Sequence, residues 1–470
     1  MVVHETPGVF VEETADPPTP GAPDRAVPAF IGYTEKGNAR TPTRIDSLPS
    51  FEQIFGTAQP ETALTVSVVA TSADPAANRA ADLAVEVLLN EDGRSRHILY
   101  YALQLFYANG GTAAYIVSAG GFTSTGPLLA DLEACLEPLA AVAEPVLVVI
   151  PEASALSNAD FKTLTDATLS RCAELDNGFA IIDAHDRANS FGSATTAVSA
   201  ATANFRDQCT GTSHLGFGAA YAPYLATTLG FAVDETAVAV SYTGDGALQP
   251  PGLTLAGLRD ADDRAYRAVK AKIGELHPVL PPSAAIAGVY ARVDAEIGVW
   301  KAPANVPVAA VTGPIIEFSP AEADRLNTDP LTGKSINTIR RFTGRGTLVW
   351  GARTLAGNDS EYRYVNVRRF ILAVRASARR AAERFVFEPN EAATWARVRA
   401  SLEGLLTDQW RAGALQGIKP DQGFFVSVGL GSTMTEQDVL EGRMIVEIGL
   451  AVVRPAEFVI LRFAQTMAEG

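Results

Sequence analysis

Five short apolar runs recur along the first half of the chain, and segments with helical spacing separate them. The runs are Ala29–Tyr33, Ala113–Val117, Val146–Ile150, Phe179–Asp183 and Phe217–Tyr221. Three of them lack polar alternation, as expected for strands covered on both faces. The helical segments between them are Arg96–Ala108, Leu128–Val142 and Ser157–Glu174. Strands that alternate with helices predict an α/β domain with a largely parallel sheet.

The last third of the chain changes to long helices followed by late strands. Glu361–Phe385 and Glu391–Leu406 have amphipathic helical spacing, and Met444–Val453 and Glu457–Phe463 are β-rich runs separated by a turn. Residues 331–470 contain 19 basic and 14 acidic residues, a net charge of +5, within a chain of net charge −15. We therefore expect an acidic α/β domain and a mildly basic C-terminal α+β domain that face different partners.

Length and composition set the expected domain boundaries and the excluded classes. At 470 residues the chain exceeds the roughly 100–200 residues of one domain. We place an N-terminal strand arm and proline-rich linker at 1–24, the α/β domain at 25–310 and the C-terminal domain at 311–470. The polar, weakly periodic segment Thr57–Gly93 is interpreted as a surface insertion. The acidic surface disfavours nucleic acid and anionic lipid as partners.

Cysteine usage and hydropathy suggest where such a chain resides. Cys135, Cys172 and Cys209 form no CxxC pair, which suits a reducing compartment better than a disulfide scaffold. The first residues lack the basic and apolar regions of a secretory signal, and no apolar stretch is long enough to span a membrane. We expect a soluble protein without membrane insertion.

The N-terminus combines a strand with a stiff spacer. Thr6–Glu13 is strand-like, and the proline-rich run Asp16–Pro23 can form neither a helix nor a central strand. A strand held away from its own domain must satisfy its backbone groups elsewhere, for example on another subunit. A frayed terminus is the alternative interpretation.

The sequence contains only weak motifs for nucleotide binding, catalysis or metal binding. Thr328–Ser335 resembles a phosphate-binding loop, but Thr328 replaces the first glycine and Pro330 removes an amide donor. His185 follows Asp183 at a strand end, and Cys209 and His214 lie close in sequence, yet neither pair has a nucleophile elbow. The five histidines show no metal-ligand spacing. We expect no catalytic, cofactor or metal site and no enzymatic activity.

The helix expected at Glu361–Phe385 is rich in arginine. The arginines are Arg363, Arg368, Arg369, Arg375, Arg379, Arg380 and Arg384. They form either a solvated helix face or an electrostatic contact with an acidic partner, and the pattern alone leaves both interpretations open.

Eight segments of the chain form a recognisable set. They are Pro7–Glu13, Phe30–Gly37, Tyr101–Gly111, Ala287–Arg292, Gly298–Asn305, Asn337–Gly346, Val349–Leu355 and Tyr364–Arg369. Together they resemble the contractile tail sheath family of phage tails, R-type tailocins and contractile injection systems. Their order and their spread over the chain carry the resemblance, whereas Phe122–Pro281 matches only in general pattern.

The resemblance implies a structural subunit that forms hexameric rings in a helical sheath around an inner tube. It implies baseplate and tail terminator or cap proteins as further partners, no cofactor, and assembly in the cytoplasm into a tail-like particle. Subunits of this family lend terminal strands to neighbours, which makes the C-terminal part a sheath-core domain with swapped terminal strands. The corresponding residues here are Gly8, Val9, Phe10, Val11 and Glu12, together with Phe458, Val459, Ile460, Leu461, Arg462 and Phe463.

The C-terminal domain of this family faces the tube, so the resemblance makes Arg368, Arg375 and Arg379 candidate tube contacts. Two functional hypotheses follow from the sequence. The first is a contractile sheath subunit. The second is a soluble α/β enzyme with a site near Asp183 and His185.

Overall fold

The computed structural model describes residues 26–71, 82–90, 93–123, 125–142, 144–185, 191, 193, 197–244 and 252–457. These residues belong to two compact units, and each is described by itself. The main unit comprises Arg25–Glu296 and Pro303–Arg363. The C-terminal unit comprises Ile297–Ala302 and the described chain from Tyr364 onward.

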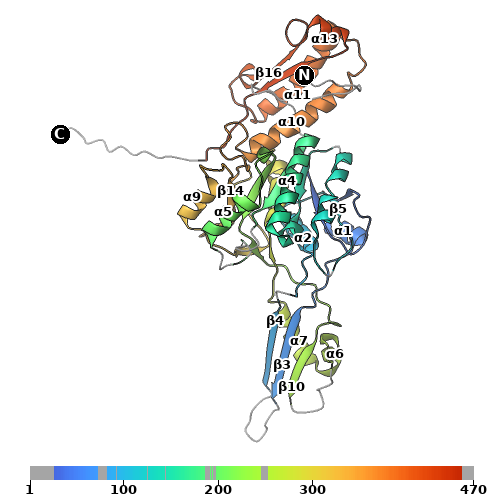
Figure 1. Cartoon of the computed structure of the whole chain (residues 1–470), viewed down its shortest axis with the longest axis vertical. Helices are drawn as coiled ribbons and strands as arrows, with labels where there is room; N and C mark the ends of the chain where they lie inside the picture. The colour runs from blue at the N-terminus through green and yellow to red at the C-terminus, as the bar shows by residue number, and fades with distance from the viewer. Residues whose placement is uncertain are drawn as a thin grey trace, which may run out of the picture. The chain divides into compact units, whose positions relative to one another are not determined.

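The described part of the main unit is built on one nine-stranded sheet (Figure 1). In spatial order its strands are β12 (Val306–Pro307), β15 (Gly346–Trp350), β14 (Ile336–Phe342), β8 (Gly218–Ala222), β7 (Gly178–Asp183), β6 (Val146–Val149), β1 (Val27–Gly32), β5 (Ala114–Ser118) and β2 (Thr43–Ile45). The strands from β14 to β5 are parallel to one another, and antiparallel strands lie only toward the two edges. The predicted largely parallel sheet is therefore confirmed.

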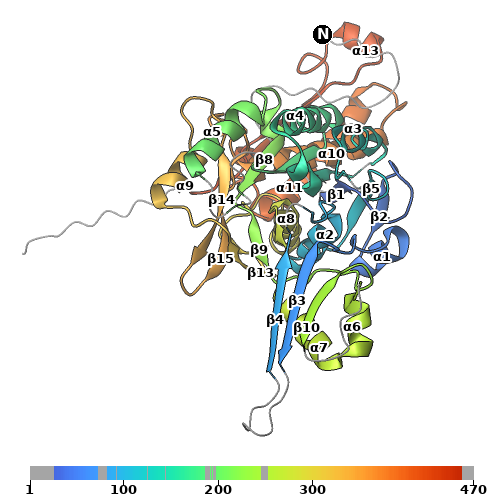
Figure 2. The same cartoon turned by 60° about the horizontal axis from the view of Figure 1, so that its bottom comes forward.

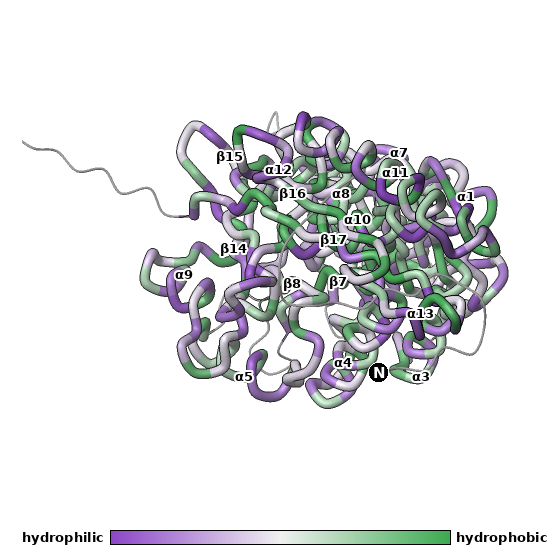
Figure 3. The backbone as a smooth tube through the Cα atoms, turned by 90° about the horizontal axis from the view of Figure 1, so that it is seen from above, coloured by the Kyte–Doolittle hydropathy of each residue, from purple (hydrophilic) through white to green (hydrophobic). Residues whose placement is uncertain are grey.

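The five apolar runs of the sequence are the inner strands of this sheet. Every residue of β6 and β7 is buried, and the middle of β7 is drawn in the green of hydrophobic residues in Figure 3. Helices cover the sheet on both faces, which explains why these strands lack polar alternation.

Two groups of helices cover the two faces. One face packs against α3 (Leu129–Glu133), α4 (Asn158–Leu175), α5 (Val198–Gln208) and α9 (Pro320–Asn327). The other face packs against α2 (Leu99–Ala108) and α8 (Ser283–Glu296). α2 and α8 approach closely at Gly288, where a Cβ atom would lie 2.4 Å from the carbonyl oxygen of Phe106.

Shorter elements complete the main unit around the large sheet. They are α1 (Leu48–Phe55), the 3₁₀ helices η1 (Glu137–Ala141), η2 (Pro151–Ala155) and η3 (Leu215–Phe217), and a small sheet of β11 (Val279–Leu280), β9 (Leu225–Thr227) and β13 (Val311–Pro314).

The segment interpreted as a surface insertion contains two long strands. β3 (Leu64–Thr71) and β4 (Asp82–Leu89) pair antiparallel, and β10 (Val240–Gly244) joins β3. α6 (Leu255–Ala261) and α7 (Asp263–Ile273) lie beside this sheet, and their apolar side chains complete a separate core (Figures 1 and 2). The burial of β4 alternates residue by residue, as expected for a strand covered on one face.

The C-terminal unit combines two long helices with a two-stranded sheet. Its helices are α10 (Val365–Glu383), α11 (Ala392–Arg411), α12 (Pro420–Gly423) and α13 (Glu436–Leu440), and its strands are β16 (Phe424–Val428) and β17 (Val446–Leu450). The predicted helices Glu361–Phe385 and Glu391–Leu406 correspond to α10 and α11. β17 lies within the predicted β-rich run Met444–Val453.

The division between the units falls at Arg363 and Tyr364, whereas the sequence analysis places a boundary at 310/311. The observed boundary lies later because the hairpin of β14 and β15 belongs to the main unit. β14 pairs with β8 and so joins the large sheet. In the described part of the chain, no helix is both long and apolar enough to cross a membrane.

Candidate functional site

The carboxyl end of the large sheet is where an open α/β fold most often binds a ligand. The chain order reverses beside β1, whose neighbours are β5 and β6, and ligands of such folds bind at this reversal. Here the position is filled by Glu152, which follows β6 and is fully buried. Its carboxylate accepts hydrogen bonds from the backbone N–H of Tyr33 at 2.9 Å and of Leu99 at 3.2 Å. Glu152 therefore caps the start of α2, a structural role.

His97 lies beside this carboxylate. Its Nδ1 is 3.8 Å from Glu152 Oε2, and its ring lies between the rings of Tyr33 and Phe122. Burial alone lowers the pKa of His97, but the negative charge of Glu152 raises it overall. Buried aromatic and carboxylate groups thus occupy the place that a substrate would need.

Asp183, at the end of β7, caps the start of a helix as Glu152 does. Its two oxygens accept from the backbone N–H of Ser283 at 2.7 Å and from the Ser283 hydroxyl at 2.6 Å, at the first residue of α8. Burial raises the pKa of Asp183 to about 7, although the hydrogen bonds from Ser283 oppose the shift. Asp183 is a buried helix cap that fixes α8 to β7.

The other suggested catalytic residues do not assemble into a site. His185 is buried against the ring of Phe161, and its Nε2 lies 3.1 Å from the carbonyl oxygen of Leu156. Cys209 is buried, whereas His214 is exposed. The geometry of the described residues therefore gives no support to the alternative hypothesis of an enzyme.

The buried cap makes the stability of the main unit depend on pH. Because the pKa of Asp183 is higher in the folded chain than its ordinary value of 3.8, folding binds a proton, and stability falls as pH rises from about 4 through about 7. The raised pKa of His97 acts in the same direction. Denaturant unfolding at pH 5 and pH 8 should show a difference of roughly 1–4 kcal/mol. Asp183→Asn should remove most of it, and an unchanged pH dependence in that variant would contradict this account.

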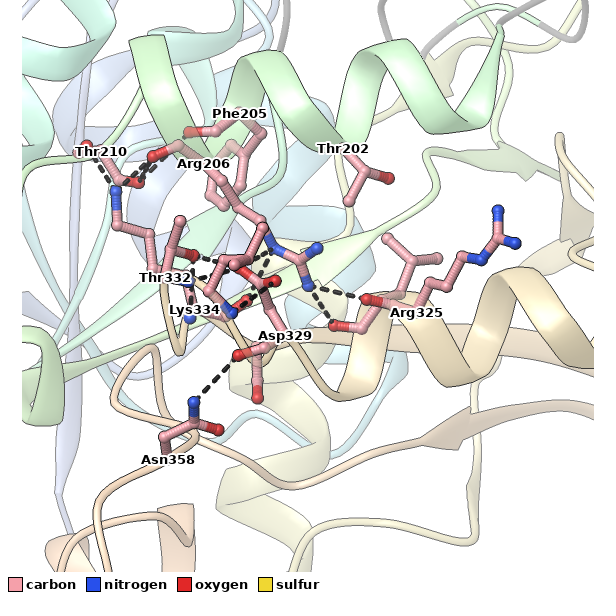
Figure 4. Close-up of polar contacts among 12 residues, drawn as sticks. Thr202, Phe205, Arg206, Thr210, Arg325, Asp329, Thr332, Lys334 and Asn358 are labelled. Carbon is pink, nitrogen blue, oxygen red and sulfur yellow. Dashed lines mark hydrogen bonds and ion pairs between the residues drawn. The ribbon is translucent and has the colours of Figure 1, made fainter.

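The turn Thr328–Ser335, which resembles a phosphate-binding loop, directs its polar side chains to other groups of this chain (Figure 4). The buried Lys334 ammonium donates hydrogen bonds to the carbonyl oxygens of Arg206 and Thr210, at the end of α5. Burial lowers the pKa of Lys334. A cation at a helix C-terminus is favourable, and Lys334 is thereby turned away from any external phosphate.

Arg206 completes this cluster from α5. Its guanidinium donates to the carbonyl oxygens of Lys334, Arg325 and Leu326 and lies 3.7 Å from Asp329. Burial alone raises the pKa of Asp329, but hydrogen bonds from Thr332 and the charge of Arg206 lower it overall. The cluster fixes α5 to α9 and β14. Neither Arg206 nor Glu152 stands out in the sequence, because their partners are distant along the chain.

No group of three or more His, Cys, Asp or Glu side chains that could hold a metal ion occurs within the described ranges.

The arginine-rich face of α10 is less exposed than the sequence suggests. Arg368 is 2% exposed, and Arg375 and Arg379 are half-buried. All three have interaction partners within the chain. Arg368 therefore offers almost no exposed surface in this structure, and the more exposed arginines of the segment are better placed for a contact. The exposed arginines at the end of this segment are Arg380 and Arg384.

The sheet of β16 and β17 has an apolar face and, at β17, an outer edge. Val426 and Ile448 are paired on the face that packs against Val398 and Leu402 of α11. Ala451 N donates to the carbonyl oxygen of the opposite residue Gly423.

Along an antiparallel ladder, hydrogen-bonded and non-hydrogen-bonded residue pairs alternate. Since Ala451 belongs to a hydrogen-bonded pair, the backbone groups of Val446, Ile448 and Leu450 point away from β16. In the part of the chain that the structure describes, no strand pairs with this edge. The residues expected to lend strands, Gly8–Glu12 and Phe458–Phe463, lie outside the described residues.

Comparisons with known proteins agree with this arrangement. The phage tail sheath protein central domain matches residues 193–355, and the phage tail sheath C-terminal domain matches residues 357–466. A protein of Pseudomonas aeruginosa (strain UCBPP-PA14), named as a prophage major tail sheath protein, is 38% identical over 88 residues. The alignment covers 18% of this chain and only 22% of that relative.

Solved structures match almost the whole chain. The helical sheath of the anti-feeding prophage in its contracted state is 28% identical with a TM-score of 0.62, covering 99% of this chain and 100% of that one. The sheath complex of an extracellular contractile injection system, PVC, also in its contracted state, is 26% identical with a TM-score of 0.62, covering 99% of both chains.

Proposed function

Because this chain belongs to the contractile tail sheath family, we propose that it is a structural subunit of the sheath of a phage tail-like injection particle. It polymerises around an inner tube and contracts to drive the tube through a target envelope. The observation that carries this proposal is the outer edge of β17 in the C-terminal unit, with which no strand pairs among the described residues.

A two-stranded sheet is marginal by itself, and an apolar face gains from further strands. The outward backbone groups of Val446, Ile448 and Leu450 are suited to pair with an added strand. We assign the added strands to other copies of this chain, from Gly8–Glu12 and Phe458–Phe463. Such a strand makes about four backbone hydrogen bonds, each worth roughly 1 kcal/mol net. Each bond is weak, but a mesh of such links holds every subunit to several neighbours.

Contraction in this proposal is a change between two packings of rigid units that the lent strands keep connected. In this proposal the subunit itself consumes no nucleotide. This is consistent with the turn Thr328–Ser335, which resembles a phosphate-binding loop but whose Lys334 side chain is bonded to the carbonyl oxygens of Arg206 and Thr210. Hexameric rings, an inner tube protein, baseplate proteins and a terminator or cap protein are the proposed partners, with assembly in the cytoplasm.

The proposed tube contact is the exposed end of the α10 segment, with Arg380 and Arg384 and the half-buried Arg375 and Arg379. Exposed ion pairs contribute only about 0–1 kcal/mol each, so such a contact can release during contraction.

Reversing the charge of Arg380 and Arg384 to Glu should impair assembly on the tube more than assembly of tube-free polymers. The measurement is the amount of sheath that pellets with and without purified tube protein. Arg411→Glu is the matched control, because Arg411 is also an exposed arginine of the same unit. Equal loss in both assays, or the same effect in the control, would remove the proposed tube contact.

The proposal as a whole is tested by pelleting the purified protein over a range of concentrations. A sheath subunit shows a threshold concentration above which added protein enters the pellet. A protein that stays in the supernatant at every concentration, with and without tube protein, contradicts the proposal.

A further inference from the structure

Among the described residues of the C-terminal unit, the two most exposed large apolar side chains lie beyond opposite ends of one helix. Phe387 is 89% exposed and lies in the turn before α11, and Ile418 is 90% exposed and lies in the turn after it. α11 has 20 residues, so its length is about 30 Å. The two side chains therefore mark two separate ends of the unit.

Phe387 occupies a backbone conformation that disfavours it. Its φ angle is +70°, in the left-handed region where Gly or Asn is usual after a helix. A bulky side chain is strained there, and its exposed ring also gains nothing from burial. Local stability would be better served by Asn, so the phenylalanine has no evident role within the subunit.

Both turns are held by side chains of α11 and, in the second turn, also of α12. Before the helix, Glu388 pairs with Arg397 at 2.7 Å, and Trp395 Nε1 donates to Asn390 Oδ1 at 2.7 Å. These contacts fix the turn that carries Phe387.

After the helix, Trp410 Nε1 donates to the carbonyl oxygen of Gly417 at 3.0 Å, and the N–H of Ile418 donates to Gln422 Oε1 at 2.9 Å. Each apolar side chain thus projects from a fixed turn, which lowers the entropy cost of docking it.

We propose that Phe387 of one subunit docks beside Ile418 of the next, so that successive C-terminal units meet head to tail. An open helical polymer requires contacts between two different patches of the same chain, because a contact of one patch with itself closes as a dimer. Two apolar side chains at opposite ends of one rigid helix meet this requirement. The molecule that contacts Phe387 is therefore a second copy of this chain. The inference rests on the proposed sheath function.

The first test compares the polymerisation threshold of three single variants with that of the parent chain. Phe387→Asn and Ile418→Ser should raise the threshold concentration about tenfold or more, as expected for removal of an apolar interface anchor. Leu331→Ser is the matched control, because Leu331 is 93% exposed but lies in the main unit. Its threshold should not change.

Thermal unfolding separates an assembly role from a folding role. Phe387→Asn should unfold at the same temperature as the parent chain or slightly higher, because Asn tolerates the left-handed conformation. A lower unfolding temperature together with weaker assembly would assign Phe387 to folding and overturn the inference, as would an unchanged threshold.

A cross-linking experiment tests the pairing itself. The Phe387→Cys/Ile418→Cys protein lacks both apolar side chains, so it is assembled above its raised threshold concentration. The three native cysteines are buried, so a short bismaleimide added to the assembled protein should react mainly at the new positions. The expected result is a ladder of covalent oligomers in the double variant and none in either single variant.

Dimers from Phe387→Cys alone, cross-links to the tube protein alone, or no cross-links in assembled polymer would each overturn the head-to-tail contact and leave the sheath function standing. If the parent chain forms no polymer at all, the proposed function fails, and this inference fails with it.

Discussion

Deleting residues 1–14 is expected to leave a folded subunit that no longer forms long sheaths. The reason is that the proposed donor strand, Gly8–Glu12, is lost while both folded units remain intact. The β17 edge of every neighbour then lacks its added strand. Circular dichroism and thermal unfolding should match the full chain, whereas pelleting and electron microscopy should show loss of long polymers.

A more specific test of the same strand keeps the full length of the chain and changes only two residues. Val9→Pro/Val11→Pro removes backbone donors from the strand, whereas Val9→Thr/Val11→Thr keeps them together with a β-branched side chain. The proline pair should behave like the deletion, and the threonine pair should assemble normally. Normal sheaths from the deleted chain would show that this segment is not an intersubunit strand.

Replacing Arg206 with Met is expected to lower the free energy of unfolding of the main unit by about 3–5 kcal/mol. The substitution leaves Asp329 buried without its cation and removes the donors to the carbonyl oxygens of Lys334, Arg325 and Leu326. Denaturant unfolding monitored on the purified chain measures the loss.

Arg325→Met is the matched control for this prediction. Arg325 contributes its carbonyl oxygen to the cluster, but its side chain is exposed, as Figure 4 shows by its direction away from Arg206. Its substitution should change stability by no more than about 0.5 kcal/mol. Similar losses in the two variants would mean that the cluster does not stabilise the contact between α5 and α9.

The inner part of the large sheet could be predicted because burial on both faces leaves a local signature. β6 and most of β7 are continuous apolar runs, and the helical segment predicted from Ser157 begins where Ser157 caps α4 by accepting from the N–H of Asp160. These features depend on neighbours along the chain.

The hairpin of β14 and β15 was not predicted, because Arg340, Arg341 and Arg345 interrupt the apolar pattern that its buried residues would otherwise show. Its place in the sheet depends on pairing with β8, more than 100 residues earlier. The insertion strands were missed for a similar reason, since β3 completes its sheet with the distant β10.

The roles of charged residues were the hardest to predict. Asp183 was located at a strand end, but its role as the cap of α8 requires Ser283, 100 residues away. The family resemblance made Arg368 a candidate tube contact, although the folded unit buries it. A sequence shows which side chains are charged, whereas tertiary packing decides which of them meet solvent.

The most direct measurement of the central claim is negative-stain electron microscopy of the purified protein at high concentration, alone and after co-expression with the tube and baseplate proteins of the same particle. The account predicts hollow, ribbed cylinders made of this chain. Dispersed globular particles under both conditions would contradict the assignment of the chain as a sheath subunit.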